Sequence, residues 1–106
     1  MTAGNLFSRI PPTLAEELVE PLVETPSFRL ERIVSAGHAM PPGAWYDQDR
    51  DEWVVLLSGS ARLQFDGEPA ARTLRPGDYL LIPAHRRHRV EATDQSDKTV
   101  WLALHF

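Results

Sequence analysis

Turn-forming residues set the first limit on what this chain can fold into. Nine prolines and six glycines are spread through 106 residues, and they separate short apolar runs from one another. This punctuation is typical of many short elements joined by turns rather than a few long helices. Several of the runs also alternate between apolar and polar positions, which is the pattern of strands with one buried face. The sequence therefore predicts one all-β domain, a sandwich or a small barrel.

The expected strands follow one another, with turn signals between them, after residue 26. They cover residues 27–35, 52–58, 61–65, 73–74, 79–82, 88–91 and 99–106. One short helix is expected before them, over residues 14–21, because Thr13 and Glu16 form a capping box and Pro21 ends the helix. The chain then divides into an N-terminal segment, residues 1–26, which packs on the barrel or on a partner subunit, and a barrel, residues 27–106.

Composition removes several classes of function. The formal net charge is −4 and the isoelectric point is near 5.5, so no basic surface for a nucleic acid or an anionic membrane is expected. Cysteine is absent, so any metal ligands must supply nitrogen or oxygen. Residues 1–10 lack the pattern of a secretory signal, and no stretch has the length of a membrane span. We therefore expect a cytoplasmic protein.

Two spaced motifs occupy the second half of the chain. In the first, Glu52 is followed after six residues by Gly59; in the second, Gly77 is followed after five residues by Pro83, and His88 stands five positions further on. The chain resembles a small single-domain cupin in both motifs and in the gap between them. The resemblance implies a conical jelly-roll β-barrel, usually paired into a homodimer, with one divalent metal ion in the lumen of most members. Because cupins catalyse unrelated reactions, the fold by itself specifies none.

The metal ligands that the resemblance implies are only partly present. Both histidines of the first cupin motif are missing, and counting back from Glu52 places either Gln48 and Tyr46, or Asp47 and the residue before Tyr46, at their positions. His88 keeps the ligand position of the second motif. We expect a divalent ion (manganese, iron, nickel or zinc) held by Gln48, Glu52 and His88, with Asp47 as the alternative ligand. An amide is a weaker ligand than imidazole, so partial occupancy is expected.

Strand alternation gives these residues a physical reason to bind a cation. Glu52 shares the face of Val54 and Leu56, where a carboxylate needs a cation or several donors to offset its loss of hydration. The alternative is that Glu52 lies at the solvated end of its strand and pairs with an arginine of residues 86–89. His88 faces inward beside Val90, either as a metal ligand or as a core histidine satisfied by a hydrogen bond. His105 shares the face of the last strand that carries Trp101 and Ala103, where a role in a pocket and a role in packing are equally expected.

Two classes of function fit these residues. The first is a metal-dependent enzyme acting on a small polar molecule, with Tyr46 or His85 placed for proton transfer. The second is a non-catalytic binding or sensing module without a bound metal, which the missing motif histidines favour. The sequence leaves open whether the protein is an enzyme.

The N-terminal segment predicts a second partner besides the small molecule. It holds more apolar side chains than a short helix beside a small barrel can bury: Leu6, Phe7, Ile10, Leu14, Leu18, Val19 and Leu22. Together with the pairing that is usual among cupins, this stripe predicts a homodimer.

Overall fold

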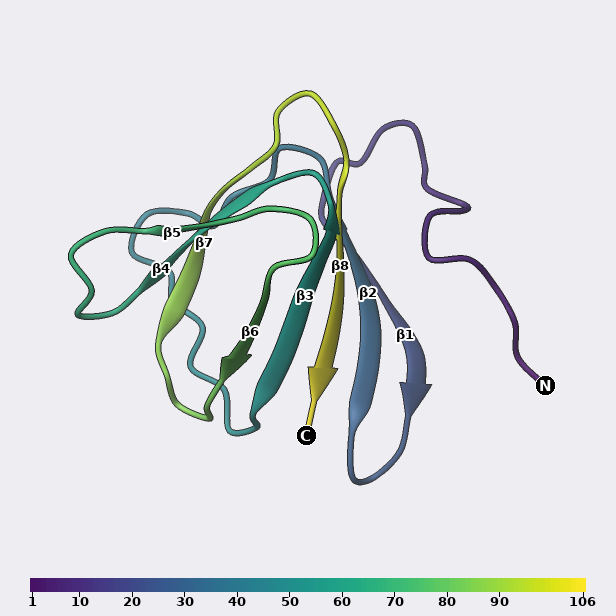
Figure 1. The fold of residues 1–106 in the computed structure, drawn as a ribbon, viewed down its shortest axis with the longest axis horizontal. Helices are drawn as coiled ribbons and strands as arrows, with labels where there is room; N and C mark the ends of the chain where they lie inside the picture. Colours follow the sequence, from purple (N-terminus) through teal and green to yellow (C-terminus); the bar gives the residue numbers. More distant parts are fainter.

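The computed structural model describes residues 1–106 and contains eight β-strands and no helix. In chain order these are β1 (Leu18–Glu24), β2 (Arg29–Ser35), β3 (Glu52–Ser58), β4 (Ala61–Phe65), β5 (Arg72–Leu74), β6 (Tyr79–Ile82), β7 (His88–Thr93) and β8 (Thr99–His105). A five-stranded sheet has the order β1-β2-β8-β3-β6, and a three-stranded sheet has the order β5-β4-β7. Figure 1 shows the strands of the larger sheet close together at one end and fanned out toward the C-terminal end of β8. The predicted all-β jelly-roll fold is confirmed.

The core lies between the two sheets. Strict alternation along β3 and β4 puts every second side chain on the inner face, which is why both strands coincide with the ranges expected from the sequence. The buried cluster draws on both sheets and contains Val54, Leu56, Ala61, Leu63, Phe65, Leu74, Ile82, Trp101 and Ala103. Each large member contributes about 1.5–3 kcal/mol through burial of its side chain. This cluster fixes the positions of the polar residues that alternate with it.

The predicted helix over residues 14–21 is wrong. Residues 14–17 form no regular element, and Leu18 begins β1, which pairs antiparallel with β2 from Leu18 opposite Val34 to Glu24 opposite Arg29. Pro21 is tolerated because β1 is an edge strand, and the register shifts between Pro21 and Val23. The strand hydrogen bonds to β2 therefore outweigh a local capping signal that could stabilise only two helical turns.

The segment before β1 is attached to the larger sheet through Arg32. This side chain is buried, its Nη1 donates hydrogen bonds to the carbonyl oxygens of Leu6 (3.0 Å) and Ser8 (2.6 Å), and its guanidinium pairs with Glu20 of β1. Within residues 1–26, β1 is thus an edge strand of the larger sheet, and the residues around Leu6 and Ser8 contact that sheet through Arg32. The structure contains no helix with the length and apolar character needed to cross a membrane.

Candidate functional site

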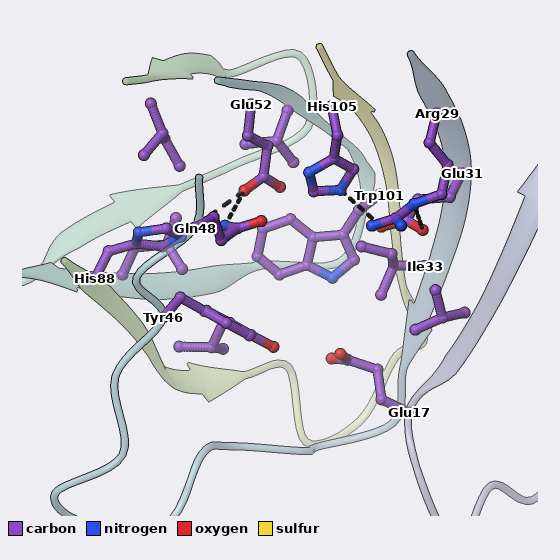
Figure 2. A pocket seen from close by; sticks show the side chains of 15 residues that line it. Glu17, Arg29, Glu31, Ile33, Tyr46, Gln48, Glu52, His88, Trp101 and His105 are labelled. Atoms are coloured by element: carbon purple, nitrogen blue, oxygen red, sulfur yellow. Dashed lines mark hydrogen bonds and ion pairs between the residues drawn. The ribbon is translucent and has the colours of Figure 1, made fainter. Parts of the chain in front are cut away.

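A cavity of about 180 Å³ lies on the inner faces of the two sheets. Its wall is formed by side chains from β1–β4 and β6–β8, from the loop before β3 and from the segment before β1. Figure 2 shows the polar ones around the indole of Trp101. The lining residues are Glu17, Val19, Arg29, Glu31, Ile33, Tyr46, Gln48, Glu52, Val54, Leu63, Ile82, His88, Val90, Trp101 and His105.

Glu52 enters this cavity as the first residue of β3. As the alternation predicted, it lies on the inner face with Val54 and Leu56, and it is only 8% exposed. Gln48 Nε2 donates a hydrogen bond of 3.0 Å to Glu52 Oε1. The carboxylate is therefore held in place by a side chain from the preceding loop, and both residues line the cavity as predicted.

His88 faces Glu52 from the opposite sheet. It is 4% exposed, and its Nδ1 lies 2.7 Å from the carbonyl oxygen of Arg86. A carbonyl oxygen only accepts, so Nδ1 carries the hydrogen and a neutral ring has a lone pair at Nε2. This Nε2 lies 3.8 Å from Glu52 Oε1. The predicted ligands Gln48, Glu52 and His88 are thus brought together.

Tyr46 covers one side of His88. The two residues exchange backbone hydrogen bonds, and their ring centroids lie 5.4 Å apart, while Phe65 stacks on the His88 ring at 5.7 Å. Burial of the phenol raises the pKa of Tyr46 above its usual value, and the negative charges of Glu17, Glu52 and Glu31 raise it further. Its hydroxyl therefore stays protonated at neutral pH, where it can donate a hydrogen bond into the cavity.

A second wall of the cavity contains an ion-pair cluster that the sequence did not predict. His105 Nε2 donates to Glu31 Oε1 at 2.8 Å, and Arg29 Nε lies 3.1 Å from Glu31 Oε2. Both His105 and Glu31 are buried, and Figure 2 shows them on the side of the indole of Trp101 opposite His88. The inward face of β8 predicted His105 as a pocket candidate, whereas no signal singled out Glu31.

The structure does not bring Asp47 and His85 into the cavity. They lie in a neighbouring polar hollow at the rim, where His85 Nδ1 is 2.8 Å from Asp47 Oδ1 and both side chains are at least half exposed. Gln48, Arg29 and His105 line both hollows, so the rim adjoins the cavity. The backbone of His85 is left-handed, with φ of 64°, a conformation that glycine adopts at lower cost than histidine.

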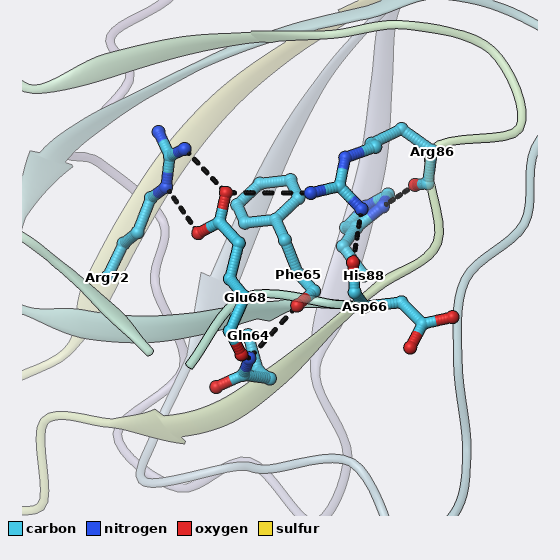
Figure 3. A network of polar contacts seen from close by, with 7 residues as sticks. All are labelled: Gln64, Phe65, Asp66, Glu68, Arg72, Arg86 and His88. Atoms are coloured by element: carbon cyan, nitrogen blue, oxygen red, sulfur yellow. Dashed lines mark hydrogen bonds and ion pairs between the residues drawn. The ribbon is translucent and has the colours of Figure 1, made fainter. Parts of the chain in front are cut away.

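The alternative partner for Glu52, an arginine of residues 86–89, is not realised. Arg86 pairs with Glu68, and Arg87 pairs with Asp66. Figure 3 shows Arg86 and Arg72 converging on Glu68, and both guanidinium groups lie over the ring of Phe65, at 5.2 Å and 5.1 Å. Arg89 donates to the carbonyl oxygen of Met40. The cluster braces the β4–β5 turn and leaves Glu52 without a cationic partner from the chain.

Comparison with known proteins identifies the fold. Residues 33–105 match the Cupin domain family. The chain belongs to the cupins. A Ralstonia eutropha protein, described as a candidate mannose-6-phosphate isomerase, is 50% identical to this cupin with a TM-score of 0.97, covering 99% of this chain and 97% of that one. A Thermus thermophilus protein, TT1209, has a TM-score of 0.77 at 17% identity and covers 99% of this chain and 96% of its own. Comparison with curated proteins finds no match.

Cupins often bind a metal ion, so the donor set of this chain needs a test of fit. No group of three or more His, Cys, Asp or Glu side chains is arranged to hold an ion. The donors that are present are the imidazole of His88, the carboxylate of Glu52 and the amide of Gln48, all in contact with one cavity. One nitrogen and two oxygens fit a borderline divalent ion, with water completing the shell. The set fits such an ion, with weaker binding than three imidazoles would give.

Proposed function

We propose that this cupin binds a divalent metal ion through His88, Glu52 and Gln48, and a small polar molecule beside it in the lumen. One observation carries the proposal. Nε2 of His88, the ring nitrogen not used by the carbonyl of Arg86, lies 3.8 Å from Glu52 Oε1, and both residues are buried. This separation is too long for a direct hydrogen bond, whereas a divalent ion between the two groups would bind the neutral imidazole and the carboxylate together. A bound divalent ion would polarise an oxygen atom of the small molecule.

Gln48 can act as the third ligand by a rotation of its own amide. Its Nε2 now faces Glu52, and turning the amide over would put its oxygen at the same place. Tyr46 lines the lumen and is the better placed of the two predicted proton-transfer residues, because its hydroxyl stays protonated. His85 lies at the rim, where it can act only on a group that projects from the mouth.

The lumen gives little support for a phosphorylated ligand, although the relative from Ralstonia eutropha is described as a candidate mannose-6-phosphate isomerase. A phosphate group needs cationic donors. The only arginine that lines the cavity is Arg29, and it already pairs with Glu31. We therefore do not extend that activity to this chain.

A second candidate function is a metal-free binding module. It is favoured by the hydrogen bond that Gln48 donates to Glu52, since an amide N–H replaces part of what a cation would supply. In this arrangement Glu52 keeps the hydrogen bond from Gln48, and no metal ion lies between Glu52 and His88.

Thermal unfolding with and without metal separates the two candidates. We expect manganese, iron, nickel or zinc to raise the Tm of the wild type, by several degrees at an ion concentration of about 100 times Kd. Glu52→Gln and His88→Gln should each abolish the shift. Asp49→Asn is the matched control, because Asp49 is exposed and does not line the cavity. A wild-type Tm that is indifferent to all four metals contradicts the metal site and leaves the metal-free module.

We also propose that the protein is a homodimer, formed through the outer face of the larger sheet. Because side chains alternate, the neighbours of the inward residues on β2, β3, β6 and β8 face outward, and one row of them is entirely apolar: Leu30, Leu104, Trp53 and Leu81. Leu81 is 61% exposed in the single chain. A continuous apolar row across four strands is expected to be covered in solution.

Light scattering tests the assembly. The wild type should have twice the 12.0 kDa of one chain, and Leu81→Glu should be monomeric without losing its fold, because Leu81 is exposed. Thr73→Glu, a change at an exposed residue of β5 in the smaller sheet, should leave the dimer intact. A wild-type monomer at micromolar concentration contradicts the proposal, and dissociation by Thr73→Glu alone would move the interface to the smaller sheet.

A further inference from the structure

Glu17 is a carboxylate in the lumen whose charge no residue of the chain balances. It belongs to the segment before β1, lies outside the residues matched to the cupin family, and lines the same cavity as Glu31 and Glu52. Glu31 is paired with Arg29 and His105, and Glu52 faces the proposed metal site. No ion pair of the structure includes Glu17. Glu17 is only partly buried, and a cation bound in the cavity would supply the counter-charge that the chain does not.

The position of Glu17 is set by the buried hydroxyl of Ser35, which is itself held by Trp101. The indole Nε1 of Trp101 donates to Ser35 Oγ at 3.2 Å, and the Ser35 hydroxyl donates to Glu17 Oε2 at 2.5 Å. Ser35 is fully buried, and Trp101 is nearly so. This chain of hydrogen bonds, which runs from β8 through β2, uses one oxygen of the carboxylate and leaves Oε1 free. Figure 2 shows the carboxylate of Glu17 and the hydroxyl of Tyr46 pointing toward each other.

A histidine on the second wall has a ring nitrogen that a group in the cavity can reach. His105 is more than nine-tenths buried and lines the cavity, its Nε2 donates to Glu31, and its Nδ1 has no hydrogen-bond partner in the chain. This Nδ1 is not one of the fully enclosed atoms, so water or a ligand contacts it from the cavity. His88, in contrast, belongs to the proposed metal site.

The chemistry around Glu17 selects the charge of that ligand. Three carboxylates and one guanidinium line the cavity, and Arg29 pairs with Glu31, so Glu17 is the carboxylate on this side of the lumen without a counter-charge. An anion placed beside Glu17 would be repelled. A protonated amine would be attracted, would donate to Oε1 of Glu17, and could still offer a neighbouring oxygen to the opposite wall.

We propose that Glu17 binds the ammonium group of a small amino alcohol, so that the lumen selects a cationic ligand over its neutral and anionic counterparts. The inference rests on the proposed function, in that it names the class of small molecule held in the lumen. The cavity of about 180 Å³ also limits its size, because a cavity of about 150 Å³ takes one benzene ring. A single six-membered ring with two small substituents is therefore the expected scale.

Three probes of matched shape test the charge preference. Vicinal aminocyclohexanol is cationic, cyclohexanediol is neutral, and hydroxycyclohexanecarboxylate is anionic. In calorimetric titration of the wild type we expect aminocyclohexanol to bind about tenfold or more tightly than the diol, since hydrogen bonds to a charged partner are the stronger ones, and the anion to bind most weakly. Comparable or tighter binding of the diol or the anion, or no binding of any probe at millimolar concentration, overturns the proposal.

Glu17→Gln tests the residue, because it keeps the shape and the acceptor for Ser35 and removes the charge. We expect it to lose the preference for aminocyclohexanol over the diol, with about a tenfold weaker affinity for the amine. Glu16→Gln is the matched control, since Glu16 is the exposed neighbour and does not line the cavity. Equal amine affinity in the two variants contradicts the assignment.

The failure of this inference and the failure of the metal site give different results. Titrations are run with manganese and with a chelator, and thermal unfolding of Glu17→Gln is recorded with the same metals. If the metal shift is absent but the amine preference persists in the chelator, the metal site fails and the role of Glu17 stands. If metal raises the Tm of both the wild type and Glu17→Gln, and Glu17→Gln binds the amine as tightly as Glu16→Gln does, the role of Glu17 fails and the metal site stands.

Discussion

Substitution of Gly59, the glycine that ends the first cupin motif, should destabilise the fold through two separate costs. Its φ is +80°, so every residue type other than glycine is strained at this position, by roughly 1–2 kcal/mol for alanine. A Cβ built on Gly59 would lie 2.3 Å from Thr99 Oγ1, 2.7 Å from Thr99 Cα and 2.9 Å from the carbonyl oxygen of Lys98. Two of these atoms belong to the backbone of β8 and its approach, and rotation of a side chain cannot move them. Overpacking of this kind adds about 1–3 kcal/mol, so Gly59→Ala should lose about 2–5 kcal/mol.

Urea denaturation followed by tryptophan fluorescence measures this loss. Gly67→Ala is the matched control, because Gly67 has a φ of +87° but its Cβ would meet nothing within 4 Å. It should lose only the conformational part, about 1–2 kcal/mol. The difference between the two variants isolates the close approach of the β3–β4 turn to Thr99. Equal losses in the two variants would refute the reasoning, since strain alone would then account for Gly59.

Three further predictions concern the rim, the second wall and the β7–β8 turn. His85→Gly should be more stable than His85→Ala by about 1 kcal/mol in the same assay, because only glycine relieves the left-handed backbone; equal stability would contradict this strain. Glu31→Ala should lose about 1–3 kcal/mol, because it leaves a ring nitrogen of the buried His105 without its acceptor, while water can reach the partly exposed Arg29; a loss below about 1 kcal/mol would show that water also replaces the carboxylate at His105. The pKa of Asp94 is lowered to about 2, first by the backbone N–H groups of Asp97 and Ser96, so its stabilisation is present above pH 4 and is lost as the pH falls through 2. Asp94→Asn should therefore be less stable than the wild type at neutral pH, with a difference that shrinks in acid; a difference independent of pH would contradict the assignment.

The fold could be predicted where local pattern and tertiary pairing agree. In β3, β4 and β6 the alternation is bounded by turn residues, and the structure reproduces the expected ranges. Residues 14–21 failed because their capping signal is local, while the partner that decides their conformation is β2, which follows later in the chain. A single sequence shows the capping residues but not which strand has a free edge to receive the segment.

The site could be predicted where it coincides with the spacing of the motifs. Glu52, Gln48 and His88 meet in one cavity, as their spacing indicated. Glu31 was missed because both faces of β2 carry apolar and charged side chains, so its alternation did not reveal which face is inward. Glu17 was missed because it was assigned to a helix, and nothing in the local sequence connects it with Ser35 or Trp101. Both depend on contacts between distant segments.

The two walls of the lumen should respond to mutation independently, because their carboxylates are anchored separately. Glu52 is held by Gln48 from the loop before β3, and Glu17 is held by Ser35 and Trp101 from β2 and β8. Neither set of anchors contains a residue of the other, and sites without shared partners have nearly additive effects. The variant Glu17→Gln/Glu52→Gln should therefore lose the metal shift and the amine preference in the amounts lost by the two single variants. A loss of amine affinity in Glu52→Gln as large as that in Glu17→Gln would show instead that the ion and the amine share one electrostatic site, and the division of the lumen into two walls would be wrong.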